Sequence, residues 1–283
     1  MEIVTALLSS LLLLISPVGF VVDQVAEDAI RSQLAGAESL EVRVDGGPSY
    51  QLLQGRVDRI RIAGRGISPV PGLRLAVAEL ETDPVDLEFK ALRNGQLVLD
   101  EPFQGAVHLV LTEADVNAFL RSPFVQNQLE SLTVGGLAPA QARERDRYKI
   151  VNPTIDFLAG NRFRISVELE DLVQEDRLLI EVETGLDAAG GDQLVLVAPT
   201  LTVNEELIDE QIVNLLLGDI GTRLNLQQLE RSGLTARVLN LTTVEDTAQD
   251  ALDLALWVRV DPSAIAPPTA AEPIEPSETE LVE

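Results

Sequence analysis

The stretch Phe103–Leu120, FQGAVHLVLTEADVNAFL, changes from a strand pattern to a helix pattern at a single residue, Thr112. Before that residue, apolar or small side chains occupy every second position: Phe103, Gly105, Val107, Leu109 and Leu111. After it, Val116, Phe119 and Leu120 fall on one face of a helix. Thr112 and Asp115 have the spacing of an N-terminal capping pair. The stretch therefore predicts a half-buried strand that leads directly into a short amphipathic helix.

The alternation of the strand part recurs on both sides of this stretch. On the N-terminal side it covers 40–44, 60–62, 73–77 and 85–89, and on the C-terminal side 149–155, 162–169, 178–184, 193–198, 235–242 and 250–260. Strands with one apolar and one polar face are typical of an antiparallel sheet that is covered on one side. We therefore predict an α+β fold in which a long curled antiparallel sheet wraps around amphipathic helices.

Two further helices are predicted from apolar spacing. Pro123 opens a turn that carries Phe124, Val125 and Leu129, and Asn204 is placed to cap a helix over 207–216. Because a strand precedes a helix in both parts of the chain, 23–138 and 146–260 form two possibly related halves of one domain, 23–260. The identity between the halves is slight.

The N-terminal segment 1–22 has no charged side chain between Ile3 and Val22. Twenty helical residues span about 30 Å, the thickness of the hydrocarbon layer. The segment fits a signal peptide, an uncleaved anchor or a buried core helix. The apolar stripe continues through Val25, Ile30 and Leu34, and this continuity favours a membrane helix that anchors the protein. We therefore expect an extracytoplasmic protein, in the periplasm or an equivalent compartment, either anchored or secreted across the inner membrane.

Composition excludes several classes of function. The formal net charge of −25 argues against a nucleic-acid partner and against attraction to anionic lipid. The chain has no Cys and one His, His108, so no metal site is predicted from His and Cys ligands. His108 has the opposite parity to Val107 and Leu109 and is expected to point away from the apolar face. No spacing singles out a catalytic pair of carboxylates, and we predict a protein that is not an enzyme and needs no cofactor.

The C-terminal segment 261–283 is a tail with five prolines, six acidic residues and no basic residue. Such a composition cannot bury enough apolar surface to fold, so we predict a disordered, acidic, Pro-rich tail. A protein partner could bind this tail, although a solvated tail without a partner is the simpler interpretation.

Many strands with few helices and only 4% aromatic residues leave an apolar sheet face that is hard to cover completely. A tunnel lined by aliphatic side chains would suit the acyl chains of a membrane lipid, since each buried CH₂ contributes about 0.8 kcal/mol. The predicted lining residues are Val107, Leu109, Leu111, Phe119, Ile208, Ile212 and Leu215. A sealed core without a cavity, as in a non-catalytic scaffold or assembly factor of the envelope, is the alternative.

Basic residues alternate along 142–149, which reads ARERDRYK. In an extended strand, Arg143, Arg145, Arg147 and Lys149 share one face. In so acidic a chain they are the candidate contacts to a lipid headgroup or to a membrane. The alternative is an exposed linker whose charges are only solvated.

Several segments together resemble the LmeA-like phospholipid-binding family. They are 53–66 (LQGRVDRIRIAGRG), 83–87 (DPVDL), 105–117 (GAVHLVLTEADVN) and the apolar N-terminal helix. The resemblance covers about 20–260 and depends on the order of these motifs. It implies a membrane-associated lipid-binding protein of the bacterial envelope, with a fold like that of tubular lipid-binding proteins and no catalytic residue. The strong acidity and the long tail depart from the family pattern.

The continuity of the N-terminal stripe predicts different results from two truncations. Removal of 1–22 should release a soluble protein of unchanged stability, whereas removal of 1–35 should also lower the free energy of unfolding. Urea unfolding of the two truncated proteins measures the difference. Equal stabilities would contradict the proposed packing of 23–35 on the sheet.

Overall fold

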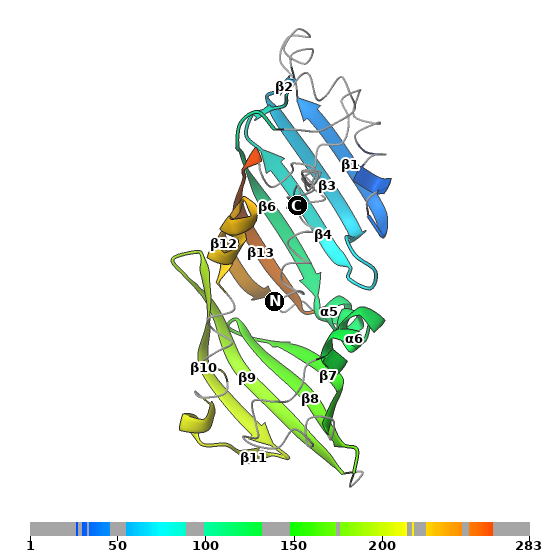
Figure 1. The fold of residues 1–283 in the computed structure, drawn as a ribbon, viewed down its shortest axis with the longest axis vertical. Helices are drawn as coiled ribbons and strands as arrows, with labels where there is room; N and C mark the ends of the chain where they lie inside the picture. The colour runs from blue at the N-terminus through cyan, green and yellow to red at the C-terminus, as the bar shows by residue number, and fades with distance from the viewer. Residues whose placement is uncertain are drawn as a thin grey trace, which may run out of the picture.

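The computed structural model consists of two antiparallel sheets arranged end to end along the long axis of the molecule (Figure 1). It describes residues 27, 30–32, 34–45, 55–88, 99–131, 148–173, 176–213, 217, 225–244 and 249–262. The predicted anchor 1–22 and all but two residues of the predicted tail lie outside these ranges. In the described part of the chain, no helix is long and apolar enough to cross a membrane.

The first sheet has six strands. In order across the sheet they are β1 (Gly36–Asp45), β3 (Arg59–Ser68), β4 (Leu75–Thr82), β6 (Phe103–Thr112), β13 (Ala251–Val260) and β12 (Leu234–Val244). A separate two-residue pair joins β2 (Arg56–Val57) to β5 (Val85–Asp86). The predicted antiparallel sheet is confirmed, and β6 alternates buried and accessible side chains as its sequence pattern requires.

The first sheet is completed by the last strands of the described chain. β13 pairs with β6 over its whole length, from Val260 beside Phe103 to Ala251 beside Thr112. β12 then forms the edge beside β13. The sheet thus combines strands from both compared halves, 23–138 and 146–260, and the relationship between these halves stays a prediction.

The second sheet has five strands from the middle of the chain. In order they are β11 (Glu206–Leu207), β10 (Gln193–Val203), β9 (Arg177–Ala189), β8 (Arg162–Asp171) and β7 (Tyr148–Leu158). Every neighbouring pair is antiparallel. The sequence predicted one long curled sheet, and the structure divides its strands between two.

Two bulges bend the second sheet. The register shifts between Val151 and Thr154 in β7 and between Val197 and Thr200 in β10. Each bulge contains a residue of positive φ followed by proline, Asn152 at 52° and Ala198 at 46°. A bulge increases local twist and bends its strand. Both strands therefore curve, which regular alternation alone did not predict.

Two helices, α5 (Glu113–Leu120) and α6 (Pro123–Ser131), lie where the sheets meet (Figure 1). The predicted cap is confirmed, because the Thr112 hydroxyl accepts a hydrogen bond from the Asp115 N–H at 3.1 Å. The predicted helix over 207–216 begins later than expected, since Leu207 belongs to β11. Asn204 does not cap it but forms a turn with φ of 48°.

The main core lies against one face of the first sheet. Ile30, from the segment before β1, and Leu226 and Leu229 of the 3₁₀ helix η1 (Leu226–Ser232) pack with the inward side chains of the strands. Val258 and Val260 of β13 are completely buried in this cluster. Burial of Ile30 agrees with the prediction that the stripe before β1 contacts the sheet.

Side chains of α5 close the free edge of the second sheet. Asn117 accepts the Ile155 N–H at 2.9 Å and donates to the Ile155 carbonyl at 2.7 Å. Glu113, one turn earlier, accepts the Phe157 N–H at 2.8 Å. These groups take the place of a neighbouring strand, and we call Glu113 and Asn117 the edge clamp. The clamp protects β7 from pairing with another chain and fixes the second sheet to the first.

Asn117→Ala should lower the free energy of unfolding by about 1–3 kcal/mol, because two backbone groups lose their partner. Hydrogen exchange at the Ile155 amide should become faster, and urea unfolding measures the stability. Gln126→Ala, at an exposed position of α6, is the control and should change neither quantity. Similar small effects of both substitutions would show that the clamp does not hold the sheets together.

Candidate functional site

The second sheet has a half-exposed apolar face. One row across four strands consists of Ile155, Ile165, Val182 and Leu201, and the next consists of Val167, Ile180 and Val203. Leu201 is buried, Ile165 is 40% exposed, and the other five are intermediate. Sheet faces inside a sealed core do not retain this much exposure. The rows form an apolar surface that can accept further apolar groups, and we call it the apolar trough.

The apolar face of the first sheet becomes more open toward the second sheet. Along β13, Val258 and Leu256 are buried, whereas Leu254 and Leu252 are only partly buried. Leu252 pairs with Thr243 of β12, whose hydroxyl donates to the Leu158 carbonyl at 2.9 Å. The less covered end of the first sheet therefore lies next to the β7–β8 turn of the second.

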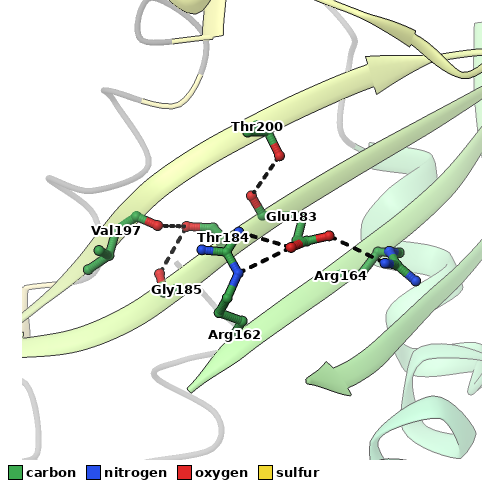
Figure 2. Close-up of polar contacts among 7 residues, drawn as sticks. All are labelled: Arg162, Arg164, Glu183, Thr184, Gly185, Val197 and Thr200. Carbon is green, nitrogen blue, oxygen red and sulfur yellow. Dashed lines mark hydrogen bonds and ion pairs between the residues drawn. The ribbon is translucent and has the colours of Figure 1, made fainter. Parts of the chain in front are cut away.

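The opposite face of the second sheet is polar and paired (Figure 2). Glu183 accepts from Arg162 at 2.9 Å and from Arg164 at 3.3 Å. The hydrogen bond from Arg162 holds the pKa of Glu183 below its ordinary value. Arg177 binds Glu168 and Glu170 at 3.0 Å each. Ion pairs between these charges keep this face stable in water. Among the described residues, the trough is therefore the face of this sheet that lacks a complete partner layer.

Figure 2 also shows how the bulge of β10 is held. The Thr200 hydroxyl donates to the Glu183 carbonyl at 3.3 Å, and the Thr184 hydroxyl donates to the carbonyls of Gly185 and Val197 at 2.9 and 3.3 Å. Thr184 is buried. These bonds join the two hydroxyls to backbone carbonyls of β9 and β10 beside the register shift.

A groove of about 430 Å³ crosses the outer, polar face of the first sheet. Its floor includes Ala63, Ala106 and Ala255, and charged side chains surround it. His108 contacts Glu79 at 3.2 Å and Asp253 at 3.1 Å there, on the face away from the core, as its parity predicted. The described residues contain no cluster of His, Asp and Glu that could hold a metal ion.

The structure places four of the predicted lining residues in or between two buried clusters. Val107 and Leu109 are buried in the main core, and Phe119 packs in a small second cluster with Leu73 and Val125. Leu111 is partly buried between the two clusters. Val107, Leu109 and Leu111 lie in β6, and Phe119 lies in α5, the helix that carries the edge clamp.

Of the other predicted site residues, the structure describes Ile208, Ile212 and Lys149. Ile208 is partly buried, and Ile212 is 49% exposed while its neighbour Val213 is 1% exposed. Lys149 lies in β7 opposite Glu170. Leu215, Arg143, Arg145 and Arg147 lie outside the described residues.

Comparison with protein families assigns the chain. The model of the LmeA-like phospholipid-binding family matches residues 15–247, which include the second sheet, the edge clamp and every strand of the first sheet except β13. The chain belongs to this family. No curated protein and no solved structure matches it. The LmeA-like family is a lipid-binding family and not a known family of enzymes, so phospholipid binding is the function that the comparison supports.

Sequence reasoning missed the edge clamp and the bulges. Glu113 and Asn117 lie four residues apart in a helix and so share one face, but their partner on β7 is distant in the sequence. The bulges had a local signal, since Asn152-Pro153 and Ala198-Pro199 each interrupt an alternating run.

His108 predicts a pH-dependent contribution to stability. The hydrogen bond to Asp253 raises the pKa of His108, and Glu79 adds to this effect. Because the pKa is raised in the folded state, the protonated imidazole stabilises the fold fully at a pH below its ordinary pKa of about 6.5. This stabilisation is lost as the pH rises through the pKa of the folded protein. His108→Gln should therefore lower the free energy of unfolding at about pH 6 and have little effect at about pH 9.

The difference at the lower pH should be below about 1 kcal/mol, because the ring is partly exposed and water screens the pair. Urea unfolding across this pH range measures it. A difference between the two proteins that does not change with pH would contradict a role for the imidazole charge.

Proposed function

We propose that this protein is a membrane-tethered extracytoplasmic lipid carrier, which shelters the acyl chains of a phospholipid on the apolar trough. The observation that carries the proposal is the incomplete cover of the rows through Ile165 and Ile180 in a family that binds phospholipid. Two acyl chains laid along these rows would cover side chains that water now contacts. Each buried CH₂ would contribute about 0.8 kcal/mol.

Three features of the trough support an acyl ligand. Its seven side chains are all aliphatic. The next row toward the first sheet consists of the buried Phe157, Phe163 and Thr184, and its two phenylalanine rings pack edge to face with centroids 5.4 Å apart. The polar face behind it has its charges paired, so it does not compete for the ligand. The bulges at Asn152 and Ala198 curve the two strands on either side of β8 and β9.

The N-terminal segment would tether the protein to the membrane on its extracytoplasmic side. The uncharged run Ile3–Val22 would keep the carrier at the membrane that supplies its lipid. The net charge of −25 means that apolar contact, and not attraction to anionic headgroups, would provide the affinity.

Ile165→Glu places a charge in the middle of the trough and should weaken the binding of a fluorescent phospholipid about tenfold or more, because a carboxylate beside an acyl chain is poorly solvated. The measurement is an equilibrium titration of the full chain. Ile165 is 40% exposed, so the substitution should leave the fold intact, and urea unfolding checks this.

Val244→Glu is the matched control, at an aliphatic residue of similar exposure, 44%, on the outer side of the first sheet. Both variants retain the N-terminal segment, so its contribution cancels in the comparison. Equal loss of binding in the two variants, or no loss in either, would contradict the assignment of the trough as the lipid site.

A further inference from the structure

Large apolar side chains are exposed at the end of the second sheet that is farthest from the first (Figure 1). In the β8–β9 turn, Leu172 is 55% and Val173 is 72% exposed, and Leu207 of β11 is 68% exposed. Leu178 and Leu179, at the start of β9, are exposed as well. The register places them together, because Leu178 pairs with Leu169 and Leu179 bonds to the β10–β11 turn. We call this end the apolar tip.

The turns of the apolar tip are held in place by buried or paired groups. The buried carboxylate of Asp171 accepts the Val173 N–H at 2.8 Å, and the Asp171 N–H donates to the Asp176 carbonyl at 2.9 Å. In the next turn, Asn204 exchanges hydrogen bonds with the backbone of Leu179 at 2.9 and 2.8 Å. Among the described residues, these bonds therefore hold the backbone of Val173 and Leu179 at the end of the sheet.

The apolar side chains project from both faces of the sheet. Leu178 follows the parity of Ile180 on the trough side, whereas Leu179 and Leu207 follow the parity of Glu181 and Thr202 on the polar side. A flat protein interface would cover only one of these faces. A sheet end that enters an apolar layer edge-on covers both, and the interface of a bilayer is such a layer.

The charges near the tip favour insertion over electrostatic attraction. Arg177 is bound by Glu168 and Glu170, and Lys149 lies opposite Glu170. Acidic side chains at Asp176 and Glu205 adjoin the turns. Anionic lipid would gain little here, so the partner that fits is a bilayer surface of zwitterionic phospholipid.

We propose that the apolar tip docks into the surface of a phospholipid bilayer through Leu172, Val173 and Leu207. The inference rests on the proposed function and adds an orientation to it. The row formed by Ile150, Leu169 and Leu178 crosses the sheet at the tip and lies next to the trough row that contains Val167 and Ile180. A phospholipid that leaves the bilayer at the docked tip meets apolar surface from the first step.

The absence of Cys from the chain allows a single fluorescent label on each variant. Val173→Cys reports on the tip, and Leu239→Cys, at a 64% exposed leucine of β12, is the matched control. Both full-length proteins carry an environment-sensitive dye and are bound to phosphatidylcholine vesicles that contain a nitroxide-labelled lipid. We expect a blue shift and quenching of severalfold at position 173 in high salt, and neither change at position 239.

A second variant links docking to lipid transfer. Leu172→Ser combined with Val173→Ser should slow the extraction of a fluorescent phospholipid from vesicles about tenfold, because two exposed aliphatic anchors are lost. Its equilibrium affinity for a soluble short-chain phosphatidylcholine should be unchanged, since neither residue belongs to the trough. An unchanged rate of extraction would contradict the proposal.

Other results of the labelling experiment would contradict docking by the apolar tip. A label at position 173 that stays unquenched on vesicle-bound protein, or equal quenching at both positions, would overturn docking by the tip. A blue shift without quenching, accompanied by self-association, would assign the tip to a protein interface and overturn the proposal. Failure of the unmodified protein to bind the short-chain lipid would instead count against the proposed function, because it does not involve the tip.

Discussion

The pairing of β13 with β6 is the interaction on which the rest of the molecule depends. It completes the first sheet, buries Val258 and Val260, and brings the Asp250 carbonyl to the Glu113 N–H at 2.9 Å. That last contact lies at the start of α5, the helix that carries the edge clamp. The position of the second sheet therefore follows from the register of a strand pair in the first, because α5 begins where β6 ends.

The two sheets differ in how completely their apolar faces are covered. The first buries most of its apolar face and supplies the main core around Ile67 and Leu234. The second leaves Ile165 and its neighbours partly in contact with water and keeps its other face stable with ion pairs around Glu183. A sheet that sealed both faces would be more stable and would have no surface left for a lipid. The edge clamp then protects β7 where the sheet lacks a further strand.

Local features of the fold could be predicted from the sequence, and long-range features could not. Alternation identified the long strands, and Thr112 identified the start of α5, because both depend on neighbouring residues. The division into two sheets depends on whether β13 pairs with β6 or with a closer strand, and alternation is the same in either case. The helix expected from Leu207 onward begins later because Asn204 and Glu205, both with positive φ, turn the chain so that Leu207 pairs with Thr202 of β10. This exception is local: a tight hairpin occupies the start of the apolar stripe. For the site, the alternation along β6 correctly predicted that His108 points away from the core. It could not predict that Val107 and Leu109 are buried in the main core, since the exposure of an apolar face depends on the segments that cover it.

The late closure of the first sheet has a consequence for how the protein is made. During synthesis, β6 emerges from the ribosome long before β13, and its free edge must wait until roughly 140 further residues have been added. The entropic cost of closing such a loop grows only slowly with length, but high contact order slows folding. Meanwhile Val107 and Leu109 remain without the partner strand that buries them. Delivery of this chain across a membrane in an unfolded state would postpone that closure until the whole polypeptide had arrived, so β6 would meet its partner strand without having folded alone.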